Sequence, residues 1–243
     1  EEKLEHEKAN RELISNISHD LKTPITAIKG YCEGILDGVA DTPEKQDKYI
    51  RTIYAKAMDM DRLINELTIY SKIDNNRIPY HFIRLNVSDY FNDCVEEVGL
   101  DLEAKNIELN YSNLVDPATQ VIADPEQMKR VINNIIGNSV KYIDKPHGII
   151  DIRILDEVDS IRIEIEDNGK GIAAKDLSMI FDRFYRTDAS RNSAQGGSGI
   201  GLSIVKKIVE DHGGYIWATS KETEGTCMHI VLRKYAEAEK ETV

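Results

Sequence analysis

Apolar residues in the first 73 positions recur at alternating intervals of three and four, which is typical of helices with one narrow apolar stripe. Gly38 interrupts this pattern, and Asp41–Glu44 starts it again with a capping residue ahead of Pro43. The first stripe comprises Ile14, Ile17, Leu21, Ile25, Ile28, Cys32 and Ile35, and the second Ile50, Ile53, Ala57, Met60, Ile64 and Leu67. These positions predict an all-α helical hairpin over residues 1–73.

The two apolar stripes also bear on oligomeric state. A lone hairpin cannot hide both stripes from water, so we expect two copies of the chain to pair as a homodimeric four-helix bundle. The alternative is that the hairpin packs against the rest of its own chain.

Residues 74–86 mix Asn, Pro and polar side chains and indicate a linker. Beyond it, helices and strands alternate over residues 87–235, followed by a tail at 236–243. The expected helices are 88–104 with Ser88 as its cap, Asp124 to about Tyr142, and one from near Gly199 to 212–214. The expected strands are 107–111, 120–123, 149–155, 161–167, 215–220 and 226–233. The third and fourth strands alternate apolar and polar residues, which is typical of half-buried antiparallel pairs.

Composition narrows the possible functions. The chain has 243 residues and a net charge of −12, which argues against general binding to nucleic acid or to an anionic membrane. No apolar run exceeds four residues, so we expect no bilayer span and no membrane contact here. The three cysteines are isolated, without a Cys-x-x-Cys pair, so their spacing supports neither a disulfide framework nor a zinc site and fits a reducing compartment.

His19 is the first candidate for chemistry. On a helical projection it lies far from the apolar stripe, which predicts an exposed imidazole, with Thr23 on the same face and Asp20 beside it. Pro24 stands inside the helical pattern, at a cost of about 3 kcal/mol. A neutral imidazole is a nucleophile, Asp20 can accept its ring hydrogen, and Thr23 can hold a water. The alternative is an ordinary surface histidine.

A second candidate is the polar row Arg130, Asn134, Asn138 and Lys141, spaced along one face of the helix after Asp124. Asparagine oxygen suits Mg²⁺ and lysine suits phosphate, and the adjacent Tyr142 can stack on a base. The alternative is a solvated helix face.

The third candidate is Asp167, which ends an alternating strand ahead of Gly169 and Gly171. A carboxylate there can accept the amino hydrogen of adenine, and the glycines let backbone approach a flat ring. A strand ending in a glycine-rich turn is an equally good explanation of this segment alone.

The fourth candidate is the glycine-rich run containing Gly197, Gly199 and Gly201, which leads into a helix as a phosphate cradle does. A polar loop rather than a strand precedes it, which excludes a dinucleotide fingerprint, and no Gly-Lys-Ser/Thr follows. We interpret the loop as a lid over a nucleotide, with Arg183 or Arg186 able to reach a γ-phosphate. The alternative for 186–195 is a plain surface loop.

Five segments in order resemble the motifs of bacterial sensor histidine kinases. ISHDLKTPITAIKGY is similar to their phospho-acceptor box, VINNIIGNSVKY to the asparagine box, EDNGKGI to the aspartate-glycine box, FDRFYR to the phenylalanine box and GGSGIGLSIVKKIVEDHGG to the second glycine box. The resemblance covers about residues 10–233. It implies a multidomain fold, in which the hairpin bundle is followed by an α/β layered sandwich with a mixed sheet, like the gyrase, Hsp90 and MutL ATPases.

The resemblance implies a role for each matching residue. His19 would be the phosphorylated nucleophile, Asp20 its acid/base partner, and Thr23 would position water for dephosphorylating a partner. Asn138 would ligate Mg²⁺ and Asp167 would hold the adenine amino group. The remaining ATP-binding residues would be Asn134, Lys141, Tyr142, Gly169, Gly171, Ile172, Arg183, Arg186, Gly197, Gly199, Gly201, Leu202 and Thr226. Three departures from the pattern are Ser139 for the usual Ala, Lys170, and Asp20 for the commoner Glu.

The function implied is ATP-dependent autophosphorylation of His19, then transfer to an aspartate of a response regulator, with phosphatase activity on that regulator. The cofactors would be ATP and Mg²⁺, and the chain would be the cytoplasmic portion of a membrane-anchored parent. One rival is a non-kinase ATPase clamp of the same nucleotide-binding group, whose ATP turnover would not need His19. Another is a coiled-coil interaction module with a degenerate nucleotide site, against which the intact Asn138, Asp167 and glycines argue.

Overall fold

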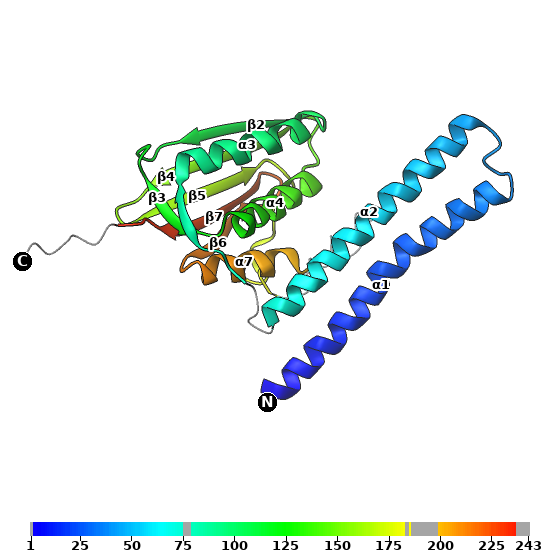
Figure 1. Cartoon of the computed structure of the whole chain (residues 1–243), viewed down its shortest axis with the longest axis horizontal. Coiled ribbons are helices and arrows are strands. Elements are labelled where there is room, and N and C mark those ends of the chain that lie inside the picture. The colour runs from blue at the N-terminus through cyan, green and yellow to red at the C-terminus, as the bar shows by residue number, and fades with distance from the viewer. Residues whose placement is uncertain (1, 75–78, 183–184, 186–198, 237–243) are drawn as a thin grey trace, which may run out of the picture. The chain divides into compact units, whose positions relative to one another are not determined.

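The computed structural model describes the backbone of residues 2–74, 79–182, 185 and 199–236. Within these ranges it leaves the side chains of residues 2–17, 19, 62, 66–67 and 69–74 undescribed. The chain divides into two compact units, a helical one that comprises residues up to 78 together with 199 and 200, and a mixed α/β one that comprises residues 79–185 and those from 201 on. Each unit is treated by itself below, and Figure 1 gives the element labels.

The first unit is the predicted hairpin. Helix α1 (Glu2–Leu36) packs against helix α2 (Pro43–Asp74). Gly38, two residues after the end of α1, adopts a left-handed φ of +74°, which explains why the helix does not continue. Thr42 caps α2, because its hydroxyl accepts the backbone N–H of Lys45 at 3.3 Å. Helix α1 continues through Pro24, whose ring is buried.

A single hairpin leaves much of its apolar stripe uncovered. Ile25, Ile50 and Ile64 are 49%, 58% and 49% exposed, although all three belong to the predicted stripes. Among the described side chains of α1 and α2, only Pro24 is buried. Apolar surface of this extent on one long face is typical of an interface that a second chain covers.

The second unit contains a five-stranded mixed sheet in the order β2-β4-β5-β7-β6. Its strands are β2 (Ile107–Asn113), β4 (Gly148–Asp156), β5 (Ser160–Asp167), β6 (Tyr215–Lys221) and β7 (Gly225–Arg233). Strand β2 runs parallel to β4, and the other neighbours are antiparallel. The alternating patterns therefore predicted the antiparallel pair β4–β5 correctly.

Helices cover one face of this sheet. Figure 1 shows α3 (Val87–Glu103), α4 (Pro125–Tyr142) and α7 (Gly201–Asp211) on that face, and α5 (Ala174–Leu177) is a single turn. The strands send alternate isoleucines toward the helices, and six of the seven isoleucines in β4 and β5 are at most 2% exposed. Burying each contributes about 1.5–3 kcal/mol, so this layer dominates the core. The six are Ile150, Ile152, Ile154, Ile161, Ile163 and Ile165.

Two local features differ from the sequence predictions. Residues 83–86, assigned to the linker, form strand β1 (Ile83–Asn86), which pairs antiparallel with β3 (Gln120–Ala123). The cap of α3 is Asn86 and not Ser88, because the side chain of Asn86 accepts the N–H of Asp89 at 3.0 Å. The Ser88 hydroxyl instead accepts a hydrogen bond from Asn113 on β2.

The segment before β1 is fastened to the second unit. The hydroxyl of Tyr80 donates to Asp211 at 2.7 Å, and the N–H of His81 donates to the buried Asp124 at 2.7 Å. His212 accepts the N–H of Asp124 at 3.0 Å through Nε2. These contacts join the segment before β1 to the start of α4 and the end of α7. Among the described residues, no helix combines the length and the apolar character that crossing a bilayer requires.

Candidate functional site

Helix α4 displays the predicted polar row because its other face is buried. Asp124 caps the helix by accepting the N–H groups of Glu126 and Gln127, both at 3.0 Å, with Pro125 in the first turn. The buried face comprises Met128, Val131, Ile132, Ile135 and Ile136, as the periodicity predicted. Asn134, Asn138 and Lys141 are consequently half-buried side chains on the opposite side of the helix.

The start of helix α7 lies against this row. The amide nitrogen of Asn134 donates to the carbonyl of Arg130 at 3.0 Å, which orients the side chain. A Cβ placed on Gly201 would come within 3.2 Å of Asn134 Oδ1. Gly201 begins α7 and half-buried Leu202 follows, while Gly199 just before them adopts a φ of +69°. The N-terminus of α7 therefore lies beside the side-chain oxygen of Asn134, on the row that also carries Lys141, and a helix N-terminus next to such a row suits a polyphosphate.

Asp167 occupies the end of β5, as predicted, and is held there by several donors. Its Oδ1 accepts the N–H of Gly169 at 2.9 Å, and its Oδ2 accepts the hydroxyl of Ser139 on α4 at 2.8 Å. Burial raises the pKa of Asp167, and the hydrogen bonds from Gly169, Ser139 and the N–H of Thr226 oppose that rise. Each carboxylate oxygen has two acceptor positions, so the carboxylate keeps capacity for a ligand N–H.

Ser139 is a residue whose contribution sequence reasoning did not identify. It stood out only as a departure from the usual alanine, and its bond to Asp167 depends on the packing of α4 against β5. Ser220 on β6 is a second such residue. Its hydroxyl donates to the carbonyl of Gly225 at 2.6 Å and accepts from Ile172 N and the Thr226 hydroxyl, each at 2.8 Å. This bond network holds Ile172 and Thr226 in place beside Asp167.

The glycines after Asp167 are required by close approaches within the protein. A Cβ on Gly169 would lie 2.7 Å from the carbonyl oxygen of Tyr142, and one on Gly171 would lie 2.1 Å from that of Lys221. Gly171 also has a φ of +71°. The same loop is tied to α4, because Lys170 N donates to Tyr142 O at 3.1 Å. From the sequence, we explained these glycines by the space that a flat ring needs. The structure gives a second reason, which is the close approach of the backbone carbonyls of Tyr142 and Lys221.

We predict that Gly171→Ala destabilises the chain by about 2–4 kcal/mol, because the substitution combines an unfavourable backbone conformation with a backbone clash. Urea unfolding measures the effect. Gly137→Ala is the matched control, since that glycine lies inside α4 with nothing within 4 Å of its added Cβ. The control should gain about 0.5–1 kcal/mol from reduced chain entropy. Equal urea midpoints for Gly171→Ala and Gly137→Ala would contradict the conclusion that position 171 requires glycine.

Several predicted site residues are not among those that the structure describes around Asp167 and helix α4. His19 lies in α1, and its side chain is outside the described part of the structure, so its predicted exposure stays a prediction. Asp20 is half-buried and Thr23 exposed on the same helix. Arg183, Arg186 and Gly197 fall outside the described residues. The described group is therefore Asp167 with Ser139, Gly169, Gly171, Ile172, Thr226 and Tyr142, next to the α4 row and the start of α7.

Comparison with known proteins identifies both units. Residues 9–76 match the His Kinase A (phospho-acceptor) domain, and residues 123–236 match the histidine kinase-, DNA gyrase B- and HSP90-like ATPase. The chain belongs to the sensor histidine kinases, of which it carries the catalytic core.

Curated relatives match nearly the whole chain. Sensor histidine kinase WalK of Bacillus subtilis is 32% identical over 233 residues, covering 96% of this chain and 38% of that protein. Sensor protein kinase WalK of Staphylococcus aureus is 31% identical over 95% of this chain and 55% of its own length. The chain therefore spans only about two fifths to half of these relatives.

Solved structures share the fold. A histidine kinase ThkA, crystallised in complex with response regulator protein TrrA, superposes with a TM-score of 0.74 at 23% identity, covering 95% of this chain and 64% of that chain. Acinetobacter baumannii histidine kinase AdeS gives a TM-score of 0.70 at 21% identity, covering 88% and 97%. At these identities the likeness concerns architecture, and it agrees with the predicted hairpin followed by an α/β domain with a mixed sheet.

Proposed function

We propose that the chain phosphorylates itself on His19 with ATP and passes the phosphoryl group to an aspartate of a separate response regulator. The observation that carries this proposal is the fixed Asp167 carboxylate beside the α4 row, in a chain whose hairpin matches a phospho-acceptor domain. A half-buried carboxylate at a strand end, oriented by hydrogen-bond donors, is suited to accept a hydrogen bond from the amino group of a purine.

The nucleotide would be held as follows. Asp167, positioned by Ser139, accepts the adenine amino hydrogen, and Gly169, Gly171, Ile172 and Thr226 surround it. Tyr142, with Lys141 placed 5.0 Å over its ring, borders the purine. Asn134, Lys141, Gly199, Gly201 and Leu202 would face the phosphates. Gly197 would do the same, and Arg183 or Arg186 would reach the γ-phosphate, although these three lie outside the described residues.

Asn138 fits a Mg²⁺ ligand, because its amide oxygen is a hard donor on the half-buried side of α4, on the row it shares with Asn134 and Lys141. When bound, Mg²⁺ neutralises charge on the phosphates and so favours phosphoryl transfer.

His19 would act as the nucleophile. Asp20 accepts the hydrogen of one ring nitrogen, which leaves the lone pair of the other nitrogen available to attack the γ-phosphorus. The bond to the leaving ADP oxygen breaks as the nitrogen–phosphorus bond forms. Such transfer requires mainly positioning and charge neutralisation from the protein.

We also propose that the active form is a homodimer through the hairpin. The half-exposed stripe residues Ile25, Ile50 and Ile64 support this interface. The response regulator is proposed as partner because a fold relative was crystallised with one, ThkA with TrrA.

Incubation with γ-labelled ATP and Mg²⁺ tests the proposal. We expect label on the chain that is lost in acid and stable in base, as a phosphorylated histidine is. ATP hydrolysis without any such label would favour the rival ATPase clamp and overturn the kinase proposal. Absence of ATP binding would favour the interaction module.

Thr23→Ala should abolish dephosphorylation of the phosphorylated regulator while autophosphorylation persists, because Thr23 is proposed to position the attacking water. The measurement is the decay of labelled regulator after addition of the chain. Thr26→Ala is the matched control, since Thr26 is also exposed on α1 and its hydroxyl donates to Lys22 O at 2.8 Å. If Thr23→Ala dephosphorylates the regulator as fast as Thr26→Ala does, Thr23 has no such role.

A further inference from the structure

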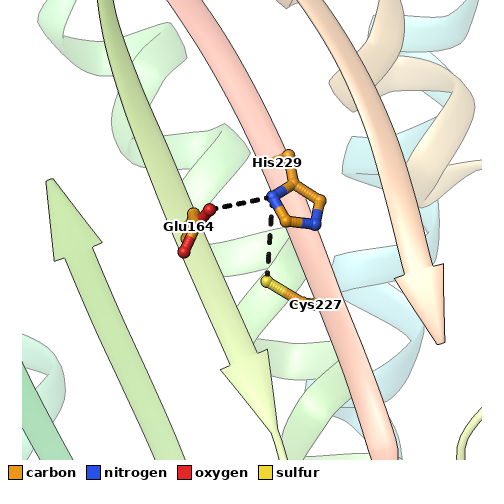
Figure 2. A group of neighbouring side chains, drawn as sticks. All are labelled: Glu164, Cys227 and His229. Atoms are coloured by element: carbon orange, nitrogen blue, oxygen red, sulfur yellow. Dashed lines mark hydrogen bonds and ion pairs between the residues drawn. The ribbon is translucent and has the colours of Figure 1, made fainter. Parts of the chain in front are cut away.

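Three side chains of metal-binding type meet on the sheet face that the helices leave uncovered. Glu164 lies on β5, and Cys227 and His229 lie on β7. Glu164 pairs with His229 in register, and Cys227 is two residues from His229, so all three project to one face. Figure 2 shows them pointing toward one another with the helices behind the strands. The proposed kinase reaction uses none of them.

The spacing of the three donor atoms is close to that of a tetrahedral metal site. His229 Nδ1 lies 3.2 Å from Glu164 Oε1 and 3.9 Å from Cys227 Sγ, and all three atoms lie within 4.8 Å of one another. Zinc bonds of about 2.0–2.3 Å at tetrahedral angles place ligand atoms roughly 3.3–3.7 Å apart. Small side-chain rotations would bring the three atoms to these separations.

The imidazole is held with Nδ1 toward the other two side chains. Its Nε2 lies 2.8 Å from the hydroxyl oxygen of Thr219, and the ring stacks on Trp217 with centroids 4.8 Å apart at 10°. The side chains of His229 and Glu164 are only 12% and 11% exposed, and Cys227 is buried. A hydrogen bond to the distal nitrogen is the usual way in which a protein orients a metal-binding histidine.

The surrounding charges favour a divalent cation once the thiol is ionised. Arg153 contacts Glu164 at 3.0 Å, and Arg162 lies 3.4 Å from both Glu157 and Glu164. Arg153 also contacts Glu166 at 2.5 Å. Three carboxylates therefore oppose two guanidinium groups, which leaves one negative charge. A thiolate at Cys227 would make two, which a divalent ion balances.

We propose that Glu164, Cys227 and His229 bind a divalent transition-metal ion, with zinc the best match to this ligand set and a water as fourth ligand. On binding, the S–H bond of Cys227 breaks, a sulfur–metal bond forms and the proton passes to solvent. Because Asp167 pairs with Thr226 and Glu166 with Cys227, the ion would link β5 to β7 one residue from the proposed adenine contacts. The competing explanation is a metal-free network in which His229 donates to Glu164 and accepts from Thr219.

Cobalt titration of the whole chain, without nucleotide, tests the proposal. We expect one equivalent of Co²⁺ to give a thiolate-to-cobalt charge-transfer band that one equivalent of Zn²⁺ removes. Cys227→Ser should lose the band, and His229→Gln should weaken Co²⁺ binding at least about tenfold. Cys32→Ala is the matched control and should keep the band, since Cys32 lies on the hairpin. No band, or a band that persists in Cys227→Ser, would overturn the proposal in favour of the metal-free network.

X-ray absorption of the zinc-loaded, unaltered chain provides a measurement that needs no variant, in case Cys227→Ser fails to fold. We expect one sulfur and three nitrogen or oxygen neighbours around zinc. A shell without sulfur, or with two or more sulfurs, would contradict the site. Neither readout depends on kinase activity, so failure of this proposal and failure of the proposed function are distinguishable.

Discussion

Chains carrying His19→Gln are expected to bind ATP normally and to incorporate no acid-labile label from γ-labelled ATP. Glutamine keeps a polar side chain of good helix propensity in α1, but its amide nitrogen lacks the nucleophilic lone pair of imidazole. The nucleotide contacts proposed for the second unit are untouched, so the binding constant should not change. Filter-retained label and a fluorescent-nucleotide titration measure the two quantities on the same samples.

His147→Gln is the control for this experiment. His147 is an exposed histidine on the second unit, paired with Glu108 at 2.8 Å, and has no proposed part in phosphoryl transfer. It should be labelled as fully as the unaltered chain. Label that survives in His19→Gln would disprove the assigned acceptor, and label lost in both variants would point to a general effect of removing histidine.

Asp167→Asn is expected to weaken ATP binding by about 2–3 kcal/mol, or roughly thirty- to 150-fold, because one acceptor oxygen becomes an N–H donor facing the adenine amino group. The unaltered chain should discriminate against a purine triphosphate without that amino group, and the variant should not. Isothermal titration with both nucleotides measures the difference. Asp151→Asn on the neighbouring strand β4 is the control and should bind both nucleotides as the unaltered chain does.

The same variant should be at least as stable as the unaltered chain. Asparagine can accept from Gly169 N–H and donate to Ser139, so these two contacts of Asp167 survive. Since burial raises the pKa of Asp167 above its ordinary value of 3.8, the folded chain favours the neutral acid. The stabilisation of the folded chain by the neutral acid is fully present below pH 3.8 and is lost as the pH rises through the pKa of Asp167 in the folded chain. At neutral pH the ionised carboxylate therefore lowers the free energy of unfolding. A lower melting temperature for Asp167→Asn at neutral pH would contradict this account.

Strong periodicity explains which elements the sequence predicted well. Helix α4 was expected from Asp124 to Tyr142 and runs from Pro125 to Tyr142, because its cap, its first-turn proline and its buried face all agree. Strands β4 and β5 alternate regularly over their lengths, and their antiparallel pairing was correct. Asp167 was expected at a strand end and lies there, because the alternation stops at this residue.

Features that depend on tertiary contacts were not predictable in the same way. Strand β1 has four residues, of which Ile83 and Arg84 are exposed, so it lacks an alternating pattern of its own and exists through its pairing with β3. The Ser139–Asp167 bond joins a helix to a strand far along the chain. Cysteine spacing likewise gave no metal motif, because only the register of β5 against β7 brings Glu164 to Cys227 and His229.

The order of the strands has a consequence for how the chain folds. Strands β4 and β5, like β6 and β7, are neighbours in sequence and can pair early as hairpins, whereas β5 and β7 pair across the whole stretch that contains α5 and α7. Closing so long a loop carries the larger entropic penalty and sets the slower step. Asp167 and Thr226 face each other across that junction. The two hairpins must therefore pair through β5 and β7 before the site can bind a nucleotide. ATP should consequently protect the β5–β7 pairing from local opening more than any other part of the sheet.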